Sequence, residues 1–250
     1  MLALDTTTRA GSVAVCDDEH VLALIPGDGV RGHAERLPGE LAAALEAASI
    51  TRDQIDLLAV ATGPGAFTGL RIGLAAMQGL AMTLNKPVIG ISALDALAAQ
   101  VIDSDTTEPM ARRAGDSAKP TARSAVEVIV PWMDAQRGEV FATLIDRKSG
   151  TVIETPTAAN PELLLESWRA HLAGRHVIFI GDAAARDAAL ITRNPGERWE
   201  TRTPAPLAAQ IAKIGLRRAR NGEAGPPHSL EPIYVRRPDP EIERERGGRS

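Results

Sequence analysis

Short apolar runs separated by turn residues open the chain. Three of them, MLALDTTT, GSVAVCDD and HVLALIPG, have the composition of adjacent strands, and Gly11, Asp17 and Gly27 interrupt them. These runs predict a three-stranded meander. Beyond it, three segments with helical spacing, 35–49, 67–85 and 92–102, alternate with two apolar, strand-like runs, 56–62 and 87–91. The first hundred residues therefore predict the element order βββαβαβα.

The same order of elements returns in the second half of the chain. Three strand-like runs at 125–134, 138–146 and 151–156 precede a helical segment at 160–172, and the run 176–181 leads into helical spacing at 182–191. Two βββαβ lobes describe the duplicated ribonuclease-H-like architecture of actin, Hsp70 and sugar kinases. The pattern therefore predicts an α/β fold of two such lobes with mixed sheets, the second less regular.

The segment between the two halves marks the predicted domain boundary. Residues 103–125 lack periodicity and are rich in Ser, Thr, Pro, Arg and Asp, which is typical of a linker or surface loop. Further apolar spacing near the C-terminus predicts one more helix. We expect a first lobe at 1–102, a second at 126–203, a helix packing on the lobes at 204–222 and an extended tail at 223–250.

Charge and cysteine content exclude several classes of protein. With 28 basic and 32 acidic residues the formal net charge is −4, so the chain is not expected to bind tRNA except through a partner. The single cysteine, Cys16, excludes an internal disulfide framework. The N-terminus has no signal-peptide pattern, and no apolar stretch reaches the roughly 18 residues of a membrane span. We expect a soluble, cytoplasmic protein.

The glycine-rich stretch GPGAFTGLRIG, residues 63–73, resembles a phosphate loop at first sight. It lacks the Gly-Lys-Ser/Thr end of a P-loop and the glycine spacing of a dinucleotide fingerprint. Backbone N–H groups of such a turn before a helix can still bind an anion, which makes Gly63 and Gly65 candidate phosphate contacts. The alternative is a tight strand-to-helix turn that allows close packing.

Carboxylates end the first predicted strand of each lobe. Asp5, followed by Thr6 and Thr7, ends one strand, and Asp134 ends its equivalent. Asp5, Thr6, Thr7 and Asp134 are therefore further candidate contacts to a nucleotide or its phosphates. If both carboxylates faced one cleft, they could hold Mg²⁺ through waters for an ATP-using enzyme, which is the alternative to a binding function. Each residue could instead cap a turn.

Two predicted helices of the first lobe have more apolar surface than one sheet can cover. Leu37, Leu41 and Leu45 share a stripe on the first. The second has two apolar stripes about 100° apart, and its members are Leu70, Leu74, Met77, Ala81 and Leu84 on one and Gly69, Gly73, Ala76 and Leu80 on the other. We hypothesise that these helices form a partner surface, with Gly69 and Gly73 allowing another backbone to approach. The alternative is a helix pair buried inside one lobe.

Catalytic constellations are missing from the sequence. The five histidines include no pair at i,i+4 and no His-Glu-x-x-His motif, and no Gly-x-Ser-x-Gly elbow is present. We therefore predict no metal site and no self-sufficient catalytic centre.

Five segments together resemble the TsaB (YeaZ) family of tRNA threonylcarbamoyladenosine biosynthesis proteins. They are MLALDTTTRAGSVAV, HAERL, residues 63–98, DAQRGEVF and PIYVR. The resemblance implies a non-catalytic relative of TsaD, the subunit that transfers threonylcarbamoyl to adenosine 37 of ANN-decoding tRNAs. TsaD-like proteins carry a His-x-x-x-His metal pair where this sequence has Ala93 and Leu97.

The same resemblance implies the partners and cofactors. It predicts a heterodimer with TsaD through the first-lobe helices, an additional ATPase subunit, TsaE, and a homodimer when the chain is alone. It implies no cofactor required by this chain, with ATP or ADP at the interface of the complex.

Overall fold

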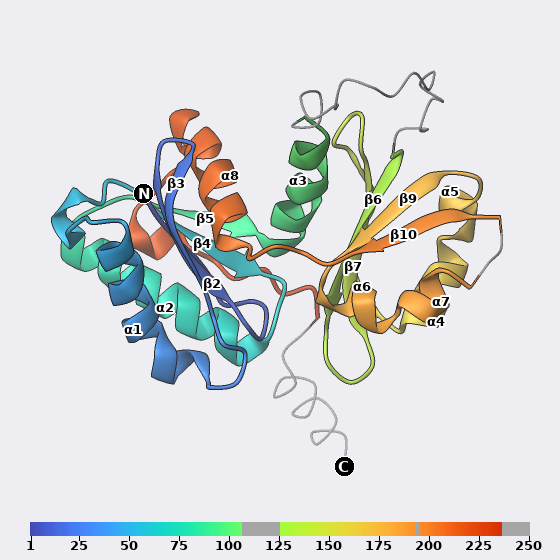
Figure 1. Ribbon diagram of the computed structural model, residues 1–250, viewed down its shortest axis with the longest axis horizontal. Helices are drawn as coiled ribbons and strands as arrows, with labels where there is room; N and C mark the ends of the chain where they lie inside the picture. The colour runs from blue at the N-terminus through green and yellow to red at the C-terminus, as the bar shows by residue number, and fades with distance from the viewer. Residues whose placement is uncertain (107–125, 194–195, 237–250) are drawn as a thin grey trace, which may run out of the picture. The chain divides into compact units, whose positions relative to one another are not determined.

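The computed structural model describes residues 1–106, 126–193 and 196–236, which fall into two units (Figure 1). Unit 1 comprises residues 1–96 and the chain from 206 onward, and unit 2 comprises residues 97–205. The boundary falls inside helix α3 (Ala93–Thr106). Most of the predicted linker, residues 107–125, lies outside the described residues.

The sheet of unit 1 combines an antiparallel meander with two parallel strands. Its strands are β1 (Leu2–Asp5), β2 (Ser12–Asp17), β3 (His20–Pro26), β4 (Leu58–Gly63) and β5 (Val88–Ser92). Their order is β3-β2-β1-β4-β5, with β1 antiparallel to β2 and parallel to β4. The predicted meander and ribonuclease-H-like topology are confirmed.

Helices cover both faces of this sheet because its side chains alternate between them. Leu2, Leu4 and Val60 face the core shared with α1 (His33–Ala47) and α2 (Phe67–Leu84). On the opposite face, α8 (Ala208–Arg220) approaches closely at Gly215, where an added Cβ would lie 3.1 Å from the Cβ of Ala59. The predicted C-terminal helix therefore belongs to unit 1.

Helix α2 ends at a residue suited to the left-handed conformation. Asn85 has φ 52° and ψ 47°, and its N–H donates to the carbonyls of Ala81 and Met82. Asn tolerates this region better than most residues, and Pro87 cannot continue the helix. A short 3₁₀ turn, η1 (Arg52–Gln54), precedes β4 in the chain.

Unit 2 repeats the topology of unit 1. Its strands are β6 (Val128–Asp134), β7 (Val140–Asp146), β8 (Val152–Ala159), β9 (His176–Ile180) and β10 (Arg198–Arg202). They lie in the order β10-β9-β6-β7-β8, so the meander again precedes the parallel strands. Strand β10 was not predicted, because its sequence RWETR is mostly polar.

The helices of unit 2 are shorter than the sequence predicts. They are α4 (Pro161–Ser167), α5 (Arg169–Leu172), α6 (Asp182–Arg186) and α7 (Ala188–Ile191). Each of the two predicted helices is thus divided in two. The core beneath them contains an aromatic group in which the ring of Trp132 lies 5.5 Å from Phe179 and 6.4 Å from Trp168.

Candidate functional site

Strand β1 ends in a buried polar loop. Asp5 Oδ1 accepts hydrogen bonds from Thr7 N at 2.8 Å and Thr7 Oγ1 at 2.6 Å, and Oδ2 accepts one from Thr8 Oγ1 at 3.1 Å. Burial raises the pKa of Asp5, although these hydrogen bonds favour the charged form. Asp5, Thr6 and Thr7 are all at most 3% exposed. These three candidate phosphate contacts are therefore buried, and the hydrogen-bond partners of Asp5 lie in the same loop.

The glycines of residues 63–73 pack directly against this loop. A Cβ added at Gly65 would lie 2.5 Å from the Cβ of Thr7, and one at Gly69 or Gly73 would overlap Thr6. At the start of the stretch, Gly63 has φ +111°, a conformation that other residues rarely adopt. The glycines allow α2 to approach β1 of its own unit. The hypothesis that Gly69 and Gly73 admit a partner backbone was wrong, because Thr6 already fills that space.

A histidine–arginine pair, in which Arg36 is buried and His33 half-buried, connects the same loop to α1. His33 Nε2 lies 3.0 Å from the carbonyl oxygen of Thr8, and Arg36 Nη2 lies 2.8 Å from His33 Nδ1. Because a guanidinium only donates, Nδ1 must accept and Nε2 must carry the proton. Burial, reinforced by the charge of Arg36, lowers the pKa of His33. His33 is thus held neutral in one tautomer.

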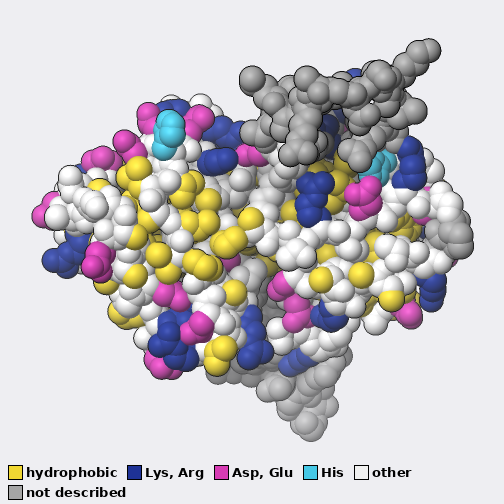
Figure 2. All heavy atoms as spheres, in the orientation of Figure 1, with side chains coloured by type: hydrophobic (Ala, Val, Ile, Leu, Met, Phe, Trp, Pro, Cys, Tyr) yellow, Lys and Arg dark blue, Asp and Glu magenta, His cyan; other side chains and the backbone are white. Residues whose placement is uncertain are grey.

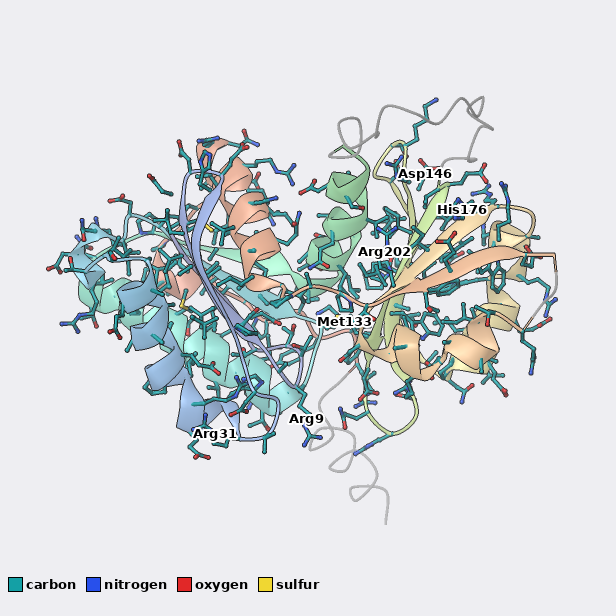
Figure 3. All side chains as sticks on the ribbon, in the orientation of Figure 1. Arg9, Arg31, Met133, Asp146, His176 and Arg202 are labelled. Carbon is teal, nitrogen blue, oxygen red and sulfur yellow. The ribbon has the colours of Figure 1, made fainter. Side chains whose placement is uncertain are left out.

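Arg36 connects three further groups. Its guanidinium forms an ion pair with Glu40 and donates to the carbonyls of Ala10 and Arg9, the latter at 3.2 Å. Arg9, labelled in Figure 3, donates in turn from Nε to Gly29 O at 2.8 Å. The pair was not predicted from the sequence, in which the histidines were considered only as metal ligands. The segment HAERL, with His and Arg three residues apart on one helix, was the available signal.

In unit 2, Asp134 is paired with an arginine. Its Oδ1 lies 2.6 Å from Arg186 Nη1, and Oδ2 accepts from Gln136 Nε2 at 2.9 Å. Arg186 also binds Asp187, whose Oδ2 accepts from Trp132 Nε1 at 2.9 Å. Burial opposes the ionisation of Asp187, but the hydrogen bonds from Arg186 and Trp132 outweigh it and lower its pKa. A guanidinium thus pairs with the carboxylate that the ATP-using alternative would assign to a hydrated Mg²⁺.

Most of the residues predicted to contact a partner belong to the core of unit 1. Leu37, Leu70, Leu74 and Met77 are at most 6% exposed, and Gly69 and Gly73 are buried as well. These six do not form an accessible surface, which corrects the predicted residue set. Leu41 and Leu45 are only partly buried. Ile72, Ala76 and Leu80 of α2 are partly buried against the same core, and α1 contacts α2. These five residues are here called the α1–α2 seam.

The solvent-exposed side of α2 is almost uncharged. It consists of six exposed residues, here called the α2 face: Thr68, Arg71, Ala75, Gly79, Met82 and Thr83. Met82 is 71% exposed, and Arg71 is the one charged residue in the sequence of α2. A surface helix normally carries several charged side chains on its outer side. The α2 face and the seam beside it therefore form an apolar surface suited to protein contact.

Two further features of unit 1 also expose apolar groups. A shallow groove of about 510 Å³ lies at the C-terminal end of α2, and its lining includes Met82, Lys86 and Pro227. Hydrophobic side chains also gather over β2 and β3 in the view of Figure 2, where the edge strand β3 exposes Val21 and Leu22.

The described ranges 1–106, 126–193 and 196–236 contain neither a cluster of metal ligands nor a membrane-spanning helix. Within them, no three His, Cys, Asp or Glu side chains come together in a way that could hold a metal ion. In the same ranges, no helix combines the length and apolar character needed to cross a bilayer.

The family model for TsaD, tRNA N6-adenosine threonylcarbamoyltransferase, matches residues 24–211, which is three quarters of the chain. The chain belongs to this family. Within the TsaD family, the chain is similar to TsaB proteins over nearly its full length. It is 29% identical to Escherichia coli tRNA threonylcarbamoyladenosine biosynthesis protein TsaB over 247 residues, which cover 94% of each protein. The predicted resemblance to TsaB is confirmed.

Two further relatives complete the comparison. An uncharacterized protein of Mycobacterium tuberculosis is 38% identical over 117 residues, which are 45% of this chain and about half (54%) of that protein. A Pseudomonas aeruginosa crystal structure, described as similar to peptidase YEAZ, superposes with a TM-score of 0.69 and 26% identity. That match covers 94% of this chain and 98% of the other. The fold thus agrees with a solved YeaZ-like structure over nearly its whole length.

Proposed function

We propose that this chain is a non-catalytic scaffold required for forming N6-threonylcarbamoyladenosine at position 37 of tRNAs that decode ANN codons. In this proposal it binds TsaD and holds it in a competent conformation, and the ATPase TsaE completes the assembly. tRNA is contacted through the complex. The chain supplies no catalytic residue and requires no cofactor of its own.

The observation that carries the proposal is the uncharged α2 face beside the α1–α2 seam. Exposed apolar surface of this kind is unfavourable in water, and this free-energy cost is removed when a partner covers the surface. The full-length similarity to E. coli TsaB supports the pathway, and membership of the TsaD family supports a structurally related partner. When the chain is alone, the same surface can pair two copies around a two-fold axis.

The polar residues support a structural role over a catalytic one. Asp5 is enclosed by Thr7 and Thr8, and Asp134 is neutralised by Arg186. A carboxylate that is already paired is a poor ligand for a hydrated metal, because the ion would have to displace the existing partner.

Reconstitution tests the proposal. The protein is mixed with TsaD and TsaE of its own organism, complex formation is followed by size-exclusion chromatography with light scattering, and tRNA modification is measured with and without this chain. The proposal predicts a heterodimer with TsaD and modification only when both are present. Modification that proceeds equally well without this chain would contradict it.

A further inference from the structure

The chain beyond α8 returns to α2 and is held there along its length. This C-terminal strap, residues 225–236, begins with paired backbone hydrogen bonds between Gly225 and Val88, at 2.9 and 3.0 Å. The side chain of Leu230 is 7% exposed and belongs to the core of unit 1. Ile233 N then donates to Thr62 O at 2.7 Å. The strap also includes the 3₁₀ turn η2 (Pro227–Ser229).

The end of the strap immobilises an arginine at the edge of the α2 face. The guanidinium carbon of Arg71 lies 3.9 Å from the centre of the Phe67 ring, and Arg71 Nε donates to Tyr234 Oη at 3.2 Å. The rings of Phe67 and Tyr234 are themselves 5.8 Å apart. Among the described residues, no acidic side chain pairs with Arg71 and no partner binds its two Nη groups.

We propose that Arg71 is an anchor for a carboxylate on the protein that docks on the α2 face, with Phe67 and Tyr234 as its positioning residues. This inference rests on the proposed function, and it adds that the docking protein presents a carboxylate to Arg71. The two Nη groups form a planar fork that matches a carboxylate. Because the aromatic rings already restrict the side chain, less conformational entropy is lost when the fork binds.

The surroundings of Arg71 favour a protein partner over a nucleic acid. Nucleic-acid affinity requires several phosphates to be neutralised together. Arg71 is instead the one charged residue of α2, and the exposed residues of the following turns, Ala75, Gly79 and Met82, are uncharged. A single arginine within an apolar patch is typical of the energetically dominant residues of protein interfaces.

The test is the dissociation constant with TsaD of the same organism, measured at several salt concentrations for four variants. Arg71→Gln removes the charge and the fork, Arg71→Lys keeps only the charge, and Tyr234→Phe keeps the ring but removes the hydrogen bond. Arg217→Gln is the matched control, because Arg217 is exposed on α8, which covers the other face of the sheet.

Arg71→Gln is expected to raise Kd about tenfold and to weaken its dependence on salt. Arg71→Lys should give a smaller increase, and Tyr234→Phe should raise Kd about threefold while the salt dependence is kept. Arg217→Gln should match the wild type in both. An Arg71→Gln variant with the affinity and salt dependence of the wild type would contradict the anchor role of Arg71, but it would leave the proposed scaffold function standing. If the wild-type chain does not bind TsaD, the proposed function fails and the anchor fails with it.

Discussion

Arg36 Nη2 lies 2.8 Å from His33 Nδ1, inside the pair that fastens the loop after β1 to α1. A proton added to His33 would turn this nitrogen into a donor facing another donor. Because folding lowers the pKa of His33, the unfolded chain binds that proton more tightly. The contribution of His33 to the free energy of unfolding is complete above about pH 6.5, the pKa of histidine in the unfolded chain. It is lost as the pH falls below that value.

We therefore expect the melting temperature to decline on acidification from pH 7.5 to 5, and to decline less in His33→Gln. Asp5 acts in the opposite direction, because its raised pKa favours the folded state at low pH. The comparison of the two proteins isolates the contribution of His33. Parallel pH profiles for the wild type and the variant would rule out this role for His33.

Two glycines of α2 should respond oppositely to the same substitution. In Gly73→Ala the new methyl group would overlap Thr6, so we expect a loss of about 2–3 kcal/mol in the free energy of unfolding. Gly79 has nothing within 4 Å of an added Cβ, so Gly79→Ala should stabilise the protein by about 0.5–1 kcal/mol through helix propensity. Denaturant unfolding measures both, and equal effects would contradict the packing described here.

The C-terminal strap should contribute to the stability of unit 1. Leu230 is 7% exposed, and Leu230→Ala is expected to cost about 2–4 kcal/mol because it leaves a cavity. Ile233 is 41% exposed, and Ile233→Ala should cost less than about 1 kcal/mol. Chemical denaturation of the two variants checks this, and a Leu230→Ala variant as stable as the wild type would show that the strap contributes nothing.

Asp134 should be dispensable for tRNA modification. Its ion pair with Arg186 is partly exposed, so Asp134→Asn is expected to change stability by no more than about 1 kcal/mol. Modification by the reconstituted complex should stay at the wild-type level. In contrast, Asp187→Asn should lower stability by about 2 kcal/mol, because Asp187 is more buried and binds both Arg186 and Trp132. Loss of modification in a folded Asp134→Asn protein would revive the ATP-using alternative.

The sequence predicted the topology well because strand alternation and helical spacing are local properties. The meander of β1 to β3 and its repetition in β6 to β8 follow from apolar runs and turn residues. Strand β10 escaped prediction because pairing with β9, and not its own polar sequence, makes it a strand.

The two helices of the candidate surface were predicted from the sequence, but most of the residues assigned to that surface are buried. Helical periodicity shows that Leu70, Leu74 and Met77 share a face, but it does not show which face points inward. In the folded unit the larger side chains fill the core, and Ala75 and Gly79 remain outside. Contacts between distant segments, such as Thr6 with Gly73, leave no periodic signal in the sequence.

The most direct test of the account is the affinity of TsaD for a protein whose α2 face carries a charge. Ala75→Asp places a carboxylate on this face, and Ala43→Asp places one on the side of α1 opposite Leu41 and Leu45, because residues two apart lie about 200° apart around a helix. Both sites are exposed, so both variants should fold. The account predicts that Ala75→Asp raises Kd at least about thirtyfold and abolishes tRNA modification, whereas Ala43→Asp binds as the wild type does. Wild-type binding and modification by Ala75→Asp would contradict the claim that this face is the docking surface.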